Sequence, residues 1–458
     1  MSALETPEAF DLRTDGAAGP KARLVTPADW DTLIAGLSAT EAAWAEAQDF
    51  QPLPGRLARL PDAAGAPGDL LIGAAAADDP WSWAAFAGTA PAGDWVPADI
   101  AGGPLPDPAL EAAVLGWALA RYRFAPAGRT VPAPRSRLAV GDVARFGATL
   151  SEAAAVRWAR RLVDRPGNDA GPDGLEDAIA GLMRSLDATV TVTRGEDLLA
   201  ANLPSIHAVG AAARQAPRLI EATWGAPDAP LVTIIGKGVS FDTGGLNIKS
   251  PAGMRQMKRD MGGAAVAAAL AALTIATARP VRVRLLVPVM KNVIGRDAFR
   301  PGDLIATRAG TLIEVDNTDC EGRIILADCL TLARESDPDL VIDCATLTGS
   351  ARTALGSEGQ ALFSPDDALA ERRVALGASH HHQAGVRLKV HVHAGPVLPR
   401  TAVAVAGHAH VDQAWIHWAE RIVVQTEAPH DARREVFDDD VGHLGEVGGE
   451  LLAAVRLE

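Results

Sequence analysis

The stretch from Ile234 to Gly263, IIGKGVSFDTGGLNIKSPAGMRQMKRDMGG, constrains the fold of this 458-residue chain more than any other. Leu231 to Ile235 is a short apolar run that ends at Gly236, which is the pattern of a buried strand that stops just before a lysine. The small residues from Ala264 to Ala272 then predict a tightly packed helix. Because open α/β sheets collect functional groups at strand ends, the stretch predicts a site there.

The acidic residues of this stretch stand next to paired glycines. Asp242 precedes Gly244-Gly245, and Asp260 precedes Gly262-Gly263 at the start of the predicted helix. Glycine allows the backbone to approach a ligand closely, and a carboxylate is stabilised at a helix N-terminus. Taken singly, each acid is most simply a turn residue. A site is therefore predicted only from their joint spacing.

A second acidic segment lies downstream, VDNTDCEGR, from Val315 to Arg323. Asp319 and Glu321 are separated by one residue, so in an extended segment both side chains would point to the same side, and Arg323 would continue the series. Like charges this close do not all ionise readily unless cations lie between them. The two segments together predict a pair of divalent metals roughly 3.5–4 Å apart, as in two-metal hydrolases.

Three segments, GKGVSFDTGGLNIK, MKRDMGG and NTDCEGR, resemble the signature segments of the leucyl aminopeptidase family, the two-metal cytosolic exopeptidases also called M17 peptidases. Their spacing agrees throughout, and the one unusual residue is Cys320, where alanine is usual. The resemblance implies a tighter metal held by Lys237, Asp242, Asp260 and Glu321, and a looser one held by Asp242, Asp319 and Glu321. A ligand set without cysteine or histidine suits Mn²⁺, Zn²⁺ or Mg²⁺.

The resemblance also implies roles for the remaining groups. Lys237 would bind metal only as the neutral amine, with its pKa depressed by the cation, whereas Lys249 would stay charged and polarise the scissile carbonyl. Arg323 would hold a bicarbonate that acts as general base. The substrate's first side chain would contact Met257, for which core packing is the alternative, and the ATLTG segment would line the pocket with Thr346, Leu347 and Gly349.

The implied reaction is removal of an N-terminal residue, leucine or another apolar residue, from short peptides. Family resemblance also implies a homo-oligomer, usually a hexamer. An alternative of a different class is a non-catalytic relative that keeps the metal scaffold as a binding or assembly module.

Length and patterning predict two domains and an α/β fold. We expect a small N-terminal α/β domain with a Pro-rich connector over residues 1–137, a linking helix over 138–165, and a larger catalytic α/β domain over 166–458 with a central mixed sheet flanked by helices. Within the latter, the runs Val281 to Val289 and Leu340 to Cys344 predict buried strands, and Ile324 to Ala333 predicts a helix stopped by Asp337-Pro338. Lys291 stands where the resembling family segment has an acid.

Charge and composition narrow the partners and the compartment. A net charge of −14 without a Lys/Arg run argues against nucleic-acid binding. The absence of a signal-peptide start and of an uninterrupted apolar run of about 18 residues argues against a membrane protein. Three cysteines without a CxxC pair fit a reduced, cytoplasmic protein.

The end of the chain, residues 380–458, departs from the rest in composition. The resemblance fades after Asp367, and ten of the eleven histidines lie between His380 and His443. Three interpretations stay open: a divergent folded end, a stretch read out of frame, or an auxiliary metal site built from the His-x-His pairs. The remaining histidine, His207, is expected to be structural.

Overall fold

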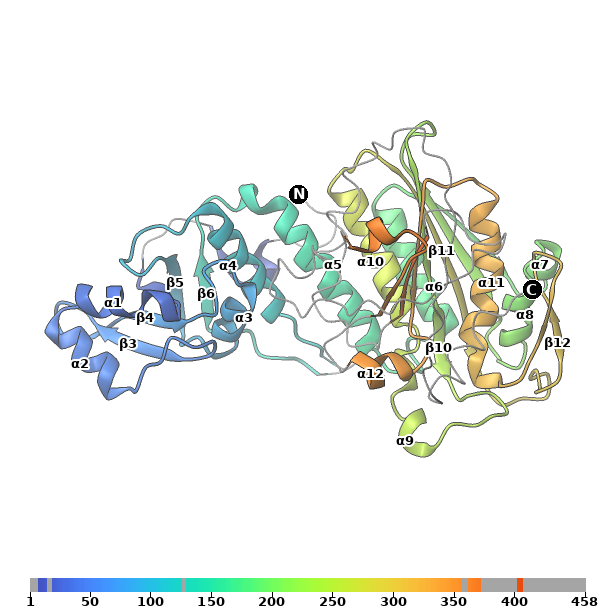
Figure 1. Cartoon of the computed structure of the whole chain (residues 1–458), viewed down its shortest axis with the longest axis horizontal. Coiled ribbons are helices and arrows are strands. Elements are labelled where there is room, and N and C mark those ends of the chain that lie inside the picture. Colours follow the sequence, from blue (N-terminus) through green and yellow to red (C-terminus); the bar gives the residue numbers. More distant parts are fainter. Residues whose placement is uncertain (1–6, 15–18, 126–128, 356–360, 372–401, 407–458) are drawn as a thin grey trace, which may run out of the picture. The chain divides into compact units, whose positions relative to one another are not determined.

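The computed structural model describes residues 7–14, 19–125, 129–355, 361–371 and 402–406, coloured in Figure 1. The chain divides into two compact units, one over Met1–Arg165 and one that begins at Pro166. Each unit contains a sheet with both parallel and antiparallel pairs, flanked by helices, which confirms the expected α/β fold class.

The first unit contains a six-stranded sheet in the order β1-β6-β5-β2-β4-β3, in which only the β3–β4 pair is antiparallel. Its strands are β1 (Leu12–Arg13), β2 (Lys21–Val25), β3 (Leu57–Pro61), β4 (Pro67–Gly73), β5 (Gly93–Ala98) and β6 (Ser136–Ala139). Its helices are α1 (Trp30–Gly36), α2 (Ala39–Ala47), α3 (Pro80–Thr89), α4 (Asp107–Ala120) and α5 (Gly147–Asp164), with short 3₁₀ turns η1 (Pro7–Phe10), η2 (Pro27–Asp29) and η3 (Val143–Phe146). Strand β6 lies partly within the stretch expected as a connector, and α5 lies within the expected linking segment.

The core of the first unit is aromatic. Phe86 packs against Trp83, Trp95 and Trp117, with ring centroids 5.7–6.1 Å apart. All four rings are buried, so they contribute a large share of the apolar area removed from water in this unit.

The second unit contains the larger sheet, in the order β15-β16-β14-β9-β11-β8-β7, with β10 also paired to β11. Its strands are β7 (Thr189–Arg194), β8 (Arg218–Trp224), β9 (Leu231–Gly236), β10 (Gly238–Asp242), β11 (Arg282–Asn292), β14 (Leu340–Ala345), β15 (Ala361–Phe363) and β16 (Ala402–Ala406). The central strands β14, β9 and β11 are parallel, so their carboxyl ends meet at one edge of the sheet. A separate ribbon pairs β12 (Leu304–Ala306) with β13 (Leu312–Glu314). The strands expected at β9, β11 and β14 are thereby confirmed.

Helices cover both faces of this sheet, as Figure 1 shows. One layer contains α6 (Pro172–Ser185) and α10 (Gly262–Ala276), which contact each other and the central strands. The other contains α8 (Pro204–Gly210) and α11 (Glu321–Arg334), which pack together over an apolar cluster. Shorter elements are α7 (Asp197–Ala200), α9 (Pro251–Met254), α12 (Ser350–Leu355), η4 (Met257–Arg259) and η5 (Thr318–Cys320). The helices expected at α10 and α11 are confirmed.

One segment, Met257–Ala276, is apolar and long enough to cross a membrane by length and composition. However, 83% of its most apolar window is buried inside the protein. That degree of burial is typical of a core helix, and here α10 packs against α6 and against β9, β11 and β14 of the sheet.

Candidate metal centre

The predicted site forms at the carboxyl ends of the central parallel strands. Lys237 follows β9, and its backbone is held on both sides: its N–H donates to Cys344 O (3.0 Å) and its carbonyl accepts from Ala264 N–H (2.8 Å). Gly236 permits this packing, because a Cβ there would lie 2.6 Å from the Cβ of Ala267 on α10. The lysine side chain is therefore held firmly in the protein interior, 2% exposed.

Three carboxylates from three different elements converge here. Asp242 is the last residue of β10, Asp319 lies in η5, and Glu321 is the first residue of α11. Each offers an oxygen, and these oxygens all lie within 4.8 Å of one another. The structure thus brings Asp242 of the first segment together with Asp319 and Glu321 of the second.

The local structure that brings Asp319 and Glu321 together differs from the expectation. The segment is helical, a 3₁₀ turn followed by the first turn of α11, whereas an extended chain was expected. Asn317 begins the turn by accepting a hydrogen bond from Asp319 N–H (2.8 Å), and such capping favours a helical start. The i, i+2 series therefore does not continue to Arg323, which makes no hydrogen bond or ion pair with these acids in the described structure.

The fourth acid, Asp260, lies immediately before the start of α10, as expected. Its Oδ1 accepts a hydrogen bond from the hydroxyl of Thr346 (2.8 Å) and lies 3.0 Å from Lys237 Nζ. Lys237 Nζ also lies 2.8 Å from Glu321 Oε1 and donates to the carbonyl of Thr346 (3.1 Å). Lys237 thus bridges Asp260, which precedes α10, and Glu321, which begins α11.

Lys249 bridges two acids in the same way on the other side of the cluster. Its ammonium lies 3.0 Å from Asp242 Oδ2 and in close contact with Asp319 Oδ1. Burial by itself would lower the pKa of Lys249, but its hydrogen bond to Asp319 and the charge of Asp242 outweigh burial and raise the pKa above its ordinary value. Lys249 is therefore a cation at neutral pH, as its expected role requires.

The acids of the cluster outnumber these two lysines, and three of the four are buried. Burial raises the pKa of Asp260 and of Asp319 to about 6 and that of Glu321 to about 8, although the neighbouring lysines act in the opposite direction. The nearby carboxylates hold the pKa of Lys237 above its ordinary value, against the effect of burial. Four acids against two lysines leave negative charge uncompensated.

The donor set fits divalent cations. Asp260 Oδ2 and Glu321 Oε2 are buried and accept no hydrogen bond from any described residue. Unpaired buried carboxylate oxygens are rare unless a cation binds them, and oxygen-rich sets suit Mn²⁺, Mg²⁺ or Zn²⁺. The residues present could hold two such ions, with Lys237 as an amine ligand once it has lost its proton.

Three polar residues, Asn292, Thr318 and Asn247, form a hydrogen-bond network that supports Asp242. The sequence analysis did not place this network in the site. Asn292 donates to Asp242 Oδ1 (2.8 Å) and to the carbonyl of Thr318 (2.9 Å). The Thr318 hydroxyl donates to Gly244 O (2.6 Å), and Asn247 exchanges hydrogen bonds with Thr318 through its backbone and side chain. The signal available in the sequence was an asparagine at the end of a predicted strand, and in the structure Asn292 is 1% exposed.

Other predicted residues are placed as follows. Thr346 contacts one of the acids directly, because its hydroxyl donates to Asp260. Leu347 lies near Lys237, since a Cβ added to Gly322 would lie 2.9 Å from each of these two side chains. Met257 is half-buried at the start of η4, and a Cβ added to Gly349 would meet nothing within 4 Å.

His207 pairs with Glu196 (3.3 Å) and not with the cluster, as expected of a structural residue. The histidines from 380 to 443 lie outside the described residues.

Comparison with known proteins identifies both units. Residues 157–417 match the model of the cytosol aminopeptidase family, catalytic domain, and residues 21–140 match that of the M17 aminopeptidase N-terminal domain. The first match extends past Asp367, where resemblance was expected to fade, and includes β16.

Among curated relatives, Peptidase B of Serratia proteamaculans is 41% identical over 231 residues, 49% of this chain and 54% of that protein. Peptidase B of Yersinia pseudotuberculosis is 40% identical over 233 residues, with the same coverage. The matched region thus spans about half the length of these relatives.

Among solved structures, cytosol aminopeptidase from Coxiella burnetii superposes with a TM-score of 0.80 at 31% identity, covering 89% of this chain and 98% of that one. The bottromycin maturation enzyme BotP in complex with Mn superposes with a TM-score of 0.73 at 26% identity, covering 90% and 98%.

Proposed function

This chain belongs to the cytosol aminopeptidase family, M17, and on that premise we propose that it is a metal-dependent aminopeptidase that hydrolyses the N-terminal residue from short peptides. The observation that carries the proposal is the convergence of the buried Asp242 and Glu321 with the half-buried Asp319, with oxygens within 4.8 Å of one another. No surface or turn role accounts for three acids gathered there together with two lysines.

Two divalent ions held by this set would supply Lewis-acid polarisation of the scissile carbonyl and an activated water. We assign Lys237, Asp242, Asp260 and Glu321 to one ion and Asp242, Asp319 and Glu321 to the other. Manganese is favoured as a cofactor because a relative was solved in complex with Mn.

The chain's own residues would bind and orient the peptide. Lys249 lies beside Asp242 and Asp319, so as a cation it would stabilise the negative charge that develops on the carbonyl oxygen. Arg323, without a partner among these acids, would hold bicarbonate as the general base. Met257 and the Thr346–Gly349 segment would receive the first side chain, for which leucine or another apolar residue is our proposal.

The test is release of p-nitroaniline from leucine p-nitroanilide by the full chain in Mn²⁺, measured together with bound metal. Turnover that EDTA removes and Mn²⁺ restores is the expected result. Bound metal without turnover on any N-terminal residue would instead favour a binding or assembly module. We further propose a cytoplasmic hexamer, which light scattering on the purified 47.5 kDa chain would test.

A further inference from the structure

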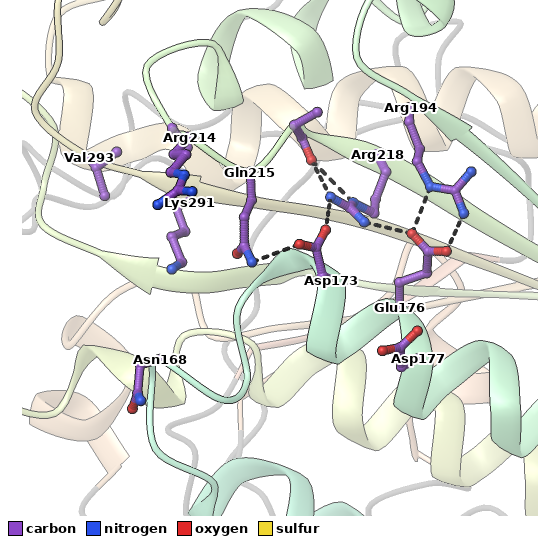
Figure 2. A pocket seen from close by; sticks show the side chains of 12 residues that line it. Asn168, Asp173, Glu176, Asp177, Arg194, Arg214, Gln215, Arg218, Lys291 and Val293 are labelled. Carbon is purple, nitrogen blue, oxygen red and sulfur yellow. Dashed lines mark hydrogen bonds and ion pairs between the residues drawn. The ribbon is translucent and has the colours of Figure 1, made fainter.

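A cavity of about 980 Å³ opens on the second unit, bordered by α6, β7, β8 and β11 (Figure 2). Seven of its twelve lining residues are charged, and none of them belongs to the metal centre. Successive residues of a strand point to opposite faces, so Asn292 turns toward Asp242 while its neighbour Lys291 turns into this cavity. The cavity is therefore separate from the metal centre.

Two of the cavity's acids are already neutralised by two of its arginines. Glu176 accepts hydrogen bonds from Arg194 (2.8 Å from Nε) and from Arg218 (2.6 Å), and the Arg194 bond in particular lowers the pKa of Glu176. Asp173 lies 2.7 Å from Arg218 and accepts from the amide of Gln215 (2.8 Å). These ion pairs fix one wall and leave its acids unavailable to other cations.

Two further cations, Arg214 and Lys291, have no such partner. Within the described part of the chain neither makes a hydrogen bond or ion pair, and Figure 2 shows them at the same end of the cavity with no interaction drawn to either. Asp177, the remaining acid, lies at the other end of the view, beyond Glu176. Positive charge is thus concentrated at one end.

The position of Lys291 adds to this excess. Gly171 is the N-cap of α6, and a Cβ built there would lie 3.3 Å from Lys291 Nζ and 2.4 Å from Gln215 Oε1. The absence of a side chain at Gly171 lets the ammonium lie against a helix N-terminus, where the backbone dipoles are also positive. The acid in the first turn of α6, Asp173, is already paired with Arg218, so it does not balance the charge of Lys291.

We propose that this cavity binds a small oxyanion, a carboxylate or a phosphate, between Arg214 and Lys291. Both cation types suit oxyanions, arginine as a planar donor and lysine as a compact charge, and the side-chain amide of Asn168 lines the same cavity. The ion pairs of Arg194 and Arg218 hold the wall in place, and the ligand would complete the charge balance at the cationic end.

The test is calorimetric titration of the full chain with sodium phosphate and, separately, with N-acetylglycine. Both are done on chain that has been stripped of metal with EDTA and then dialysed free of the chelator, so that no metal can bind the anion and no EDTA carboxylate can occupy the site. The ionic strength is held constant with KCl. The double variant Arg214→Gln/Lys291→Gln is compared with Arg184→Gln, which removes an exposed charge from the other end of α6. Equal thermal midpoints would show that all chains are folded.

We expect one saturable site for at least one probe, with affinity at least ten-fold weaker in the double variant and unchanged in Arg184→Gln. Tighter binding of phosphate would identify a phosphate ligand, and tighter binding of N-acetylglycine a carboxylate such as a peptide C-terminus. The proposal is overturned if neither probe saturates, or if the double variant binds as tightly as the parent. Because no turnover is measured, the result is independent of the proposed aminopeptidase activity.

Discussion

Lys249 lies between Asp242 and Asp319 at a position where it neutralises acids that we assign to metal ions. In Lys249→Ala we expect kcat to fall by on the order of 10²–10³ or more, because a cation at the carbonyl oxygen would be lost. Metal content by mass spectrometry should stay close to that of the parent, since no assigned ligand is removed. Loss of metal from this variant would contradict the role given to Lys249.

Asn292 does not reach the cluster's centre, yet it fixes Asp242 through a 2.8 Å hydrogen bond and ties it to Thr318. Asn292→Ala should weaken metal affinity by roughly 10–100-fold, because a ligand without its outer hydrogen bond is poorly oriented. Metal titration would measure this, and saturating Mn²⁺ should restore most of kcat. If Mn²⁺ affinity is unchanged, Asn292 has only a structural role.

At the scale of elements, the contact between α10 and β14 depends on Gly263. A Cβ there would lie 2.1 Å from the carbonyl oxygen of Cys344, in the backbone of β14. Gly263→Ala should therefore destabilise the second unit by about 1–3 kcal/mol or more, because neither backbone can move without separating helix from strand.

The matched control for that prediction is Gly181→Ala in α6, where a Cβ would meet nothing within 4 Å. Alanine favours a helix over glycine, so stability should stay the same or rise by about 0.5–1 kcal/mol. Chemical denaturation of both variants would separate the two effects. Equal destabilisation would mean that the α10–β14 contact is not the cause.

Strand β14 also carries a buried acid outside the metal cluster, Asp343. Burial raises its pKa to about 7, and its Oδ1 has no hydrogen-bond partner in the described structure. The folded state therefore holds the proton more tightly than the unfolded state, whose ordinary value is about 3.9. The stability that this group contributes is present below pH 4 and is lost as pH rises toward 7.

Asp343→Asn should remove that dependence. Relative to the variant, the parent should be about 3 kcal/mol less stable at pH 8 than at pH 5, because each pKa unit corresponds to about 1.4 kcal/mol. Parallel denaturation in EDTA across this range would measure the difference between the two proteins. A difference that does not change with pH would show that Asp343 keeps its ordinary pKa.

At the scale of the whole molecule, metal and folding should be linked, because the acids of the cluster come together only in the folded chain and an ion that binds only the folded state stabilises it. Removing metal with EDTA should lower the thermal midpoint, and Mn²⁺ at about 100 times its Kd should return about 2.7 kcal/mol of stability for each ion bound. Differential scanning calorimetry would measure both states. The midpoint of Asp242→Ala should not respond to Mn²⁺, and a full response there would contradict the assigned site.

Much of the second unit's framework could be predicted from local pattern. The apolar run that ends at Gly236 became β9, and the small-residue run after Gly263 became α10. The prediction of an extended chain at Asp319 and Glu321 was wrong, although the sequence carries a local signal for a helix. Asn317 caps a 3₁₀ turn, so the two acids lie at a helical start.

The sequence by itself determined which residue types surround the site and that β9 and α10 flank its first segment, because strand and helix periodicity depend on near neighbours. Only the tertiary structure decided that Lys249 pairs with Asp242 and Asp319, that Asn292 braces Asp242, and that Lys291 faces a different cavity. These contacts join residues far apart in the chain. Their geometry depends on how β9, β10, β11 and β14 align, and that alignment is a property of the packed sheet.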